Sequence, residues 1–160
     1  MPVQLTFDNK AANRVMMSSA RMDWCTPEWL YKSLDGEFDF DYDPCPPNPR
    51  INGLDSVWGQ CTYCNPPYGR GIGAWLRKGY AESKQGKTVV FLLPSRTDTK
   101  WWHEYVALAS EIRFIRGRIK FKGARYNAPF PSVIVIFRGG NHEKSLHRPR
   151  LGQTDGLGDV

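Results

Sequence analysis

The chain has 160 residues, of which 41% are hydrophobic and 13% aromatic, and its formal net charge is +6 at pH 7. It is long enough for one buried core, and it has neither an apolar run near the ~18 residues of a membrane span nor a recognisable secretory signal, so we expect one soluble domain. The positive charge favours a polyanionic partner such as nucleic acid, although solubility alone also explains a basic surface.

The first predicted element is a short helix. Residues 1–22 show no sustained periodicity and are expected to form an irregular arm. Thr26 is a favoured N-cap residue, and Pro27 suits the first helical position because its missing N–H would have no intrahelical partner. Gly36 offers a C-terminal stop. The sequence therefore predicts a helix over 27–35.

An alternation of rings and carboxylates follows. Residues 38–44 read Phe-Asp-Phe-Asp-Tyr-Asp-Pro, which has the period of a strand with one buried face. Three acids so close together repel unless some meet donors, which makes Asp41 and Asp43 candidates for binding hydroxyls or an ammonium group. Residues 45–59 are rich in Pro, Asn and Gly, and we expect a loop anchored by Trp58.

The most informative stretch is Cys61-Thr62-Tyr63-Cys64-Asn65-Pro66-Pro67-Tyr68. A short apolar strand must stop at Asn65, because two consecutive prolines lack the N–H groups that extend a ladder. The result is a rigid corner that holds an amide and a ring. Such a corner suits a nucleobase, since Asn65 and neighbouring carbonyls can accept from an exocyclic amine while Tyr68 stacks. An ordinary strand-to-helix turn is the alternative.

The remaining elements alternate between helices and strands. In chain order they are a helix over 71–85, a strand over 87–93 ended by Pro94, a helix of about 100–109 with Thr99 as N-cap, a strand over 111–115, a turn near Gly117, a short strand around 118–122 and a strand over 132–137. Residues 139–160 have few apolar side chains and are expected to be a disordered tail.

Strand, helix and strand in succession imply parallel pairing, and ligands of open α/β sheets bind beyond the carboxyl ends of the strands. Three strands end in segments rich in functional groups. These are Asp43-Pro44-Cys45-Pro46, Asn65-Pro66-Pro67-Tyr68 and Pro94-Ser95-Arg96-Thr97-Asp98. We expect all three at one edge of the sheet.

Cations alternate with rings toward the C-terminal end. They are Arg113, Arg116, Arg118, Lys120, Lys122 and Arg125, interleaved with Phe114, Phe121 and Tyr126. This pattern suits phosphates and exposed bases, and it also fits a plain strand with polar residues outward.

The cysteines indicate a reducing compartment. Four of them occur without a secretory signal, so we expect free thiols and a cytoplasmic protein. Cys61 and Cys64 have the short spacing of a zinc ligand pair, but residues three apart in a strand point to opposite faces. No metal is expected.

Several of these motifs occur together in one known order. They are Trp24-x-Thr26-Pro27, Asp41-x-Asp43, Asn65-Pro66-Pro67-Tyr68-Gly69, Leu92-Leu93-Pro94 with Thr97-Asp98-Thr99-x-Trp101-Trp102, and Gly117-Arg118-Ile119-x-Phe121. In this the chain resembles the phage-type Dam-like DNA N6-adenine methyltransferases over about 22–138. The resemblance implies a Rossmann-like methyltransferase domain over 23–138, with a compact, mostly parallel sheet, helices on both faces and an antiparallel C-terminal strand.

The resemblance also implies an adenine-specific DNA methyltransferase that uses S-adenosylmethionine and acts on double-stranded DNA, in the bacterial host cytoplasm if phage-encoded. The implied catalytic residues are Asn65, Pro66, Pro67 and Tyr68. The implied donor-binding residues are Trp24, Thr26, Pro27, Asp41, Asp43 and Pro44. We assign DNA binding to Arg96, Arg116, Arg118, Lys120, Lys122 and Arg125.

One departure from methyltransferase patterns is clear: the first strand is followed by Asp43-Pro44-Cys45-Pro46-Pro47 and not by a glycine-rich turn. Together with the basic cluster, this departure keeps open a non-catalytic nucleic-acid-binding module of the same fold. A cytosine-N4 methyltransferase is a second alternative, because it acts on the same kind of exocyclic amine. RNA as the substrate is a variant of the same hypothesis.

Overall fold

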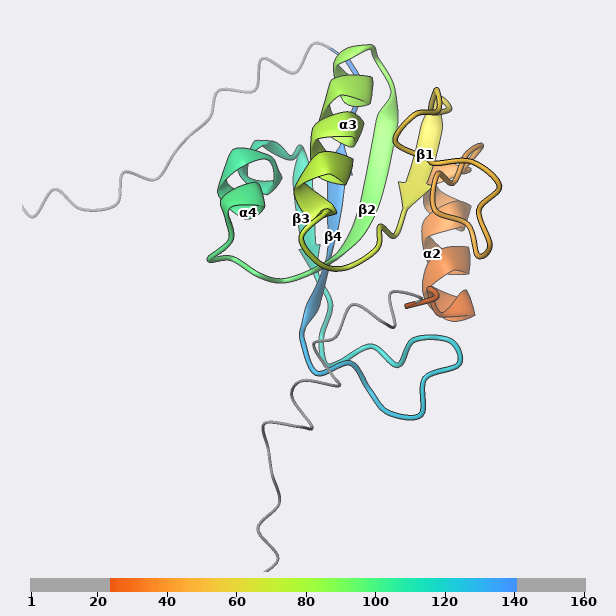
Figure 1. The fold of residues 1–160 in the computed structure, drawn as a ribbon, viewed down its shortest axis with the longest axis vertical. Coiled ribbons are helices and arrows are strands. Elements are labelled where there is room, and N and C mark those ends of the chain that lie inside the picture. The colour runs from red at the N-terminus through yellow and green to blue at the C-terminus, as the bar shows by residue number, and fades with distance from the viewer. Residues whose placement is uncertain (1–23, 141–160) are drawn as a thin grey trace, which may run out of the picture.

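The computed structural model describes residues 24–140, which form a four-stranded sheet with helices packed against it (Figure 1). The strands are β1 (Cys61–Cys64), β2 (Thr88–Pro94), β3 (Glu111–Phe114) and β4 (Ser132–Phe137). The helices are α2 (Glu28–Phe38), α3 (Ile72–Lys84), α4 (Lys100–Glu104) and the 3-10 turn η1 (Val106–Leu108). The predicted arm, 1–22, and most of the predicted tail, 141–160, lie outside the described residues.

The sheet is mixed. Its order is β1-β2-β4-β3, in which β1 and β2 pair in parallel while β4 runs antiparallel to both β2 and β3. The α/β class and the antiparallel strand β4 are confirmed. The expectation of a mostly parallel sheet is wrong. Because β4 lies between β2 and β3, only one of the three described strand pairs is parallel.

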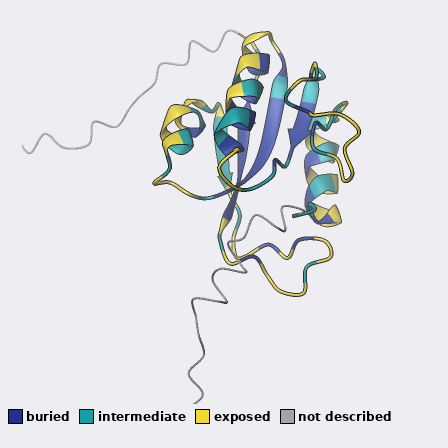
Figure 2. Ribbon diagram, in the orientation of Figure 1, coloured by how far each residue is buried: buried dark blue, intermediate teal, exposed yellow. Residues whose placement is uncertain are grey.

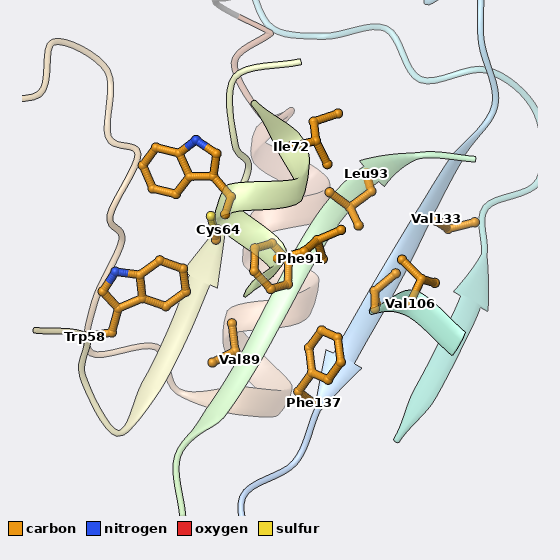
Figure 3. Packing of buried hydrophobic residues seen from close by; sticks show 12 residues of the cluster. Trp58, Cys64, Ile72, Val89, Phe91, Leu93, Val106, Val133 and Phe137 are labelled. Atoms are coloured by element: carbon orange, nitrogen blue, oxygen red, sulfur yellow. The ribbon is translucent and has the colours of Figure 1, made fainter. Parts of the chain in front are cut away.

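Helices cover both faces of the sheet, as expected. Residues of β2 alternate between the two sides: Val89, Phe91 and Leu93 pack in one cluster, and Val90 and Leu92 in the other. The first cluster includes side chains of α3, and Figure 3 shows its members between this helix and the sheet. The second includes side chains of α2. Burial of both faces explains why β2 and β4 are continuous apolar runs (Figure 2).

The segment predicted as a strand over 38–43 is mostly not one. Helix α2 continues past Gly36 to Phe38, and Asp39 then turns the chain with a φ of 54°. The Asp39 N–H donates to the Asp35 carbonyl, which closes the helix beyond the predicted stop. Only Tyr42 pairs with β1, in a single parallel bridge to Thr62.

Two other predicted elements are also corrected. The helix predicted over 100–109 ends at Glu104, and the 3-10 turn η1 follows it. Thr99 occupies the N-cap position as predicted, but its hydroxyl donates to the Arg96 carbonyl and accepts no hydrogen bond from the helix backbone. The segment predicted as a short strand around 118–122 belongs to none of the four described strands. Its backbone pairs once with Cys25, through Lys122, and once with Ala128, through Ile119, so no continuous pairing develops.

Candidate active site

The corner after β1 forms as predicted. The strand ends at Cys64, and Asn65 and the two prolines carry the chain away from the sheet before α3 begins at Ile72. Pro66 is buried and Asn65 is half-buried. The Tyr68 hydroxyl donates to the Leu92 carbonyl of β2 at 3.4 Å, which ties the corner to the neighbouring strand.

The amide of Asn65 is held in one orientation. Its Nδ2 donates to the Trp24 carbonyl at 2.5 Å and to the Thr26 hydroxyl at 3.2 Å. Its Oδ1 is buried and has no partner within the described residues, a condition it shares with the hydroxyls of Thr62 and Ser132. A buried acceptor without a donor costs about 1–3 kcal/mol. Of these three atoms, Asn65 Oδ1 is the one at the corner, where it could accept from a donor outside the chain.

Aromatic rings surround the corner. Tyr68 makes T-shaped contacts with Phe121 and Phe130, at ring-centroid distances of 6.1 and 5.5 Å. Trp24 packs on the same two rings at 5.1 and 5.7 Å. Burial raises the pKa of Tyr68, so its phenol stays neutral. Phe130 was missed in the sequence, where nothing distinguishes it from a core residue.

The acidic segment lies beside the corner, as predicted. Tyr42 pairs with Thr62. The sulfur of Cys45 lies 3.9 Å from the sulfur of Cys64, the residue directly before Asn65. Asp43 Oδ1 accepts from the Cys45 N–H at 2.8 Å, and burial raises the pKa of this carboxyl. A partly desolvated carboxylate therefore lies in the segment that packs beside the corner.

Asp41 lies elsewhere. Its carboxylate accepts from the backbone N–H groups of Gln60 and Cys61, at 2.9 and 3.0 Å. These groups precede or open β1, whereas Asn65 follows its end. The structure thus places Asp43 but not the Asp41 carboxylate near the corner, and the donor-binding role of Asp41 stays a prediction.

The segment 24–27 also lies at the corner, although not as its sequence suggested. Pro27 is buried and occupies the N-cap position, and helix α2 starts one residue later. Thr26 does not cap the helix, because its hydroxyl faces Asn65 and Tyr63. Pro44 is buried too, and its carbonyl approaches Gly53 so closely that a Cβ there would lie 2.1 Å away.

A basic loop over 115–131 leaves the same edge of the sheet (Figure 1). It ends where Pro131 accepts from the Ser95 N–H and Ser132 pairs with Pro94, at the end of β2. Ile119 and Phe121 are buried, while Arg118, Lys120 and Lys122, which alternate with them, are exposed. Within residues 24–140, no ion pair involves the six residues assigned to DNA: Arg96, Arg116, Arg118, Lys120, Lys122 and Arg125. All six are exposed.

The profile of the family described as DNA N-6-adenine-methyltransferase (Dam) matches residues 14–147. The chain belongs to the Dam family. The match contains the whole described domain, including the corner, the acidic segment and the basic loop of this Dam family member.

One relative is the DNA N-6-adenine-methyltransferase of Haemophilus phage HP1 (strain HP1c1). It is 33% identical to this Dam family chain over 112 residues, which cover 61% of the chain and 65% of the relative. The chain therefore matches just under two thirds of the relative's length. No solved structure matches the chain significantly.

Two further observations concern residues 24–140 of this Dam family member. No helix there is long and apolar enough to cross a membrane. No three His, Cys, Asp or Glu side chains in that range are grouped so that they could hold a metal ion.

Proposed function

We propose that the chain transfers a methyl group from S-adenosylmethionine to the exocyclic N6 of adenine in double-stranded DNA. The observation that carries this proposal is the buried, unpaired Asn65 Oδ1 at the carboxyl end of β1. An exocyclic amine is a suitable donor for that acceptor, because it brings two N–H groups to a narrow corner. Membership of the Dam family supports the same chemistry.

The residues beside the corner fit the methyl donor. Asp43 accepts one backbone N–H through Oδ1, and its Oδ2 makes no hydrogen bond within the described residues. That oxygen is available to hydroxyls or an ammonium group. When bound, S-adenosylmethionine supplies an electrophilic methyl group carried on a sulfonium. We assign its binding to Trp24, Thr26, Pro27, Asp43 and Pro44, and to Asp41 through its support of the β1 backbone.

The chain's own part in the reaction is to orient and polarise the amine. The lone pair of adenine N6 is delocalised into the ring, so N6 is a poor nucleophile. Acceptance of its hydrogens by Asn65 Oδ1 and the Pro66 carbonyl favours a pyramidal nitrogen and stabilises the positive charge that develops there. The N6–CH₃ bond would form as the S–CH₃ bond of the sulfonium breaks to leave a neutral thioether, and the extra proton on N6 would pass to solvent. Pro67 fixes the backbone of the corner. Tyr68 stacks on the base, and alignment of the reacting atoms supplies much of the remaining acceleration.

Adenine inside a duplex cannot reach a buried oxygen, so the base must leave the stack and the side chains over Oδ1 must part. Extrusion costs a few kcal/mol, and stacking on an aromatic ring returns about 1–3 kcal/mol. The six exposed cations, which form no ion pair within residues 24–140, hold the DNA backbone while this happens. The finer fold assignment, a Rossmann-like methyltransferase domain, belongs to this proposal, as does action in the cytoplasm of a bacterial host.

The test is an Asn65→Ala variant incubated with unmodified DNA and methyl-labelled donor, followed by nucleoside analysis. We expect the wild-type chain to yield N6-methyl-2′-deoxyadenosine and the variant to lose at least about a hundredfold in rate while still binding DNA. Gln85→Ala, which removes an exposed amide at the far end of α3, is the control and should methylate normally. A variant with normal rates would remove Asn65 from the mechanism.

The same assay separates the alternatives. Label in N4-methylcytosine would identify a cytosine-N4 enzyme, since both reactions act on an exocyclic amine. Absence of label, together with no S-adenosylmethionine binding in calorimetry, would identify a nucleic-acid-binding module that lacks a donor pocket.

A further inference from the structure

We propose that Thr26 and Tyr63 are positioning residues for the transfer, and that together with the Trp24 carbonyl they require an amide, and not a carboxylate, at position 65. This inference rests on the proposed function and extends it to the residues that orient the Asn65 amide: Tyr63, which has no assigned contact with base or donor, and Thr26, whose hydroxyl contacts Asn65 in addition to the donor-site role assigned above. The observation behind it is a hydrogen-bonded chain that runs from the buried face of the sheet to the Asn65 amide.

The chain begins at a fixed phenol. Tyr63 is 2% exposed, and its ring packs against Tyr31 and Phe40 at centroid distances of 5.2 and 5.3 Å. Its hydroxyl lies 2.7 Å from the Thr26 hydroxyl, which in turn accepts from Asn65 Nδ2. Burial raises the pKa of Tyr63 far above its ordinary value, so this hydroxyl stays protonated. A rigid phenol therefore fixes the rotation of the Thr26 hydroxyl.

The Trp24 carbonyl determines the other contact. A carbonyl can only accept, so the side-chain atom that faces it must be a donor. If the Asn65 amide were flipped, Oδ1 would face the Trp24 oxygen, and the hydrogen bond at that position would become a repulsion between two acceptors. Thr26 reinforces the choice by accepting a second hydrogen from Nδ2. Only one amide orientation satisfies both contacts, and it directs Oδ1 to the side without a protein partner.

A carboxylate cannot meet these conditions. Aspartate at position 65 would place an ionised oxygen against the Trp24 carbonyl, where the wild-type chain has an N–H group. Protonation resolves the conflict, because the acid O–H can donate to the carbonyl while the other oxygen still accepts from the substrate. An Asn65→Asp enzyme should therefore be active in its neutral form, at low pH, and lose activity as the carboxyl ionises.

The kinetic test compares Thr26→Val, Thr26→Ser and Tyr63→Phe. Thr26→Val removes one hydrogen bond from the amide, so kcat should fall about tenfold, with KM for DNA unchanged within about twofold. Thr26→Ser keeps the hydroxyl and should restore kcat, and Tyr63→Phe should fall between the two. Thr88→Val and Tyr80→Phe are matched controls at the opposite end of the sheet and on α3. Wild-type kcat in Thr26→Val would overturn the proposal.

The pH test uses Asn65→Asp. Relative to the wild-type chain at each pH, its kcat should rise as the pH falls from about 8 to about 6, as expected for a carboxyl that must be neutral to donate. A merely structural defect would lower kcat by the same factor at every pH. An Asn65→Asp enzyme with the wild-type rate and pH profile would show that the Trp24 carbonyl does not select the amide.

A third measurement does not depend on catalysis. In the ¹⁵N-labelled chain, the Asn65 side-chain NH₂ signal can be assigned by its loss in Asn65→Ala, and we expect its hydrogen exchange to be slower in the wild type than in Thr26→Val. Slower exchange in the wild type, without methylation activity, would contradict the proposed function and support the hydrogen-bonded chain. Methylation activity with equal exchange in both proteins would support the proposed function and contradict the hydrogen-bonded chain.

Discussion

Gly73 and Gly79 both lie in α3, but they have different surroundings. A Cβ at Gly79 would lie 2.4 Å from Cζ of Phe91, whereas one at Gly73 would have the Trp101 Cβ as its nearest neighbour, at 3.6 Å. Gly79→Ala should therefore lower the free energy of unfolding by ~1–3 kcal/mol through overpacking, less a helix-propensity gain of up to ~1 kcal/mol. Gly73→Ala should raise it by ~0.5–1 kcal/mol. Urea titrations of both variants measure these values, and a Gly79→Ala protein as stable as the wild type would contradict the close packing.

For single residues, the sequence predicts those features that depend on residues adjacent in the chain. The corner at Asn65 follows from two adjacent prolines after a strand, so it could be located without coordinates. Thr26 was misinterpreted because Thr-Pro-Glu is also a helix start. Its actual partners, Tyr63 and Asn65, are 37 and 39 residues away, and no local pattern encodes them.

Charged side chains connect three elements at the far end of the domain. Glu37 of α2 pairs with Arg113 of β3, Arg113 pairs with Glu111, and Glu111 pairs with Arg138 just after β4. Hydrogen bonds from Arg113 and Arg138 lower the pKa of Glu111 to about 2. Arg113, which the sequence analysis grouped with the alternating cations and rings of 113–126, is therefore engaged within the fold.

This network predicts a pH-dependent stability. Because the pKa of Glu111 is lower in the folded state, its contribution is present above the unfolded pKa, near 4.5, and is lost as the pH falls toward about 2. Glu111→Gln should lower the melting temperature at pH 7, and the difference from wild type should shrink across that acidic range. Glu28→Gln, which removes one exposed pair with Lys32, is the control and should have little effect. A difference that is constant with pH would exclude the ionic explanation.

Elements with strong patterns were predicted well, and their pairing was predicted only in part: β1 and β2 are parallel neighbours as expected, whereas β3 does not pair with β2. Continuous apolar runs identified β2 and β4, because strands covered on both faces have no polar side. The alternation over 38–43 was misleading, since Phe38 and Phe40 stack on each other at the end of α2 rather than along a strand. The place of β4 between β2 and β3 could not be predicted, because the loop before it is long enough to reach more than one position.

Some cations of the molecule form ion pairs, whereas those of the basic loop form none within residues 24–140, and DNA binding at different salt concentrations can distinguish the two groups. If the basic loop binds phosphates, each lost contact should reduce the slope of log K against log salt concentration for DNA binding by ~0.9. Lys120→Gln and Lys122→Gln should each approach that change, since both side chains are exposed and unpaired within residues 24–140. Lys32→Gln, on α2, removes the same charge from a paired site. Equal slopes in all four proteins would place the DNA elsewhere.

Strand β4 lies inside the sheet although it is the last of the four described strands to be synthesised. Its six pairs with β2 join residues about forty positions apart, and β3 has no partner other than β4 among residues 24–140. A nascent chain that has reached only the basic loop can form the β1–β2 pair but cannot complete the sheet. Because long-range pairing is slow, the folding rate of this protein should be limited by one late step, the pairing of residues 132–137 with β2 and β3.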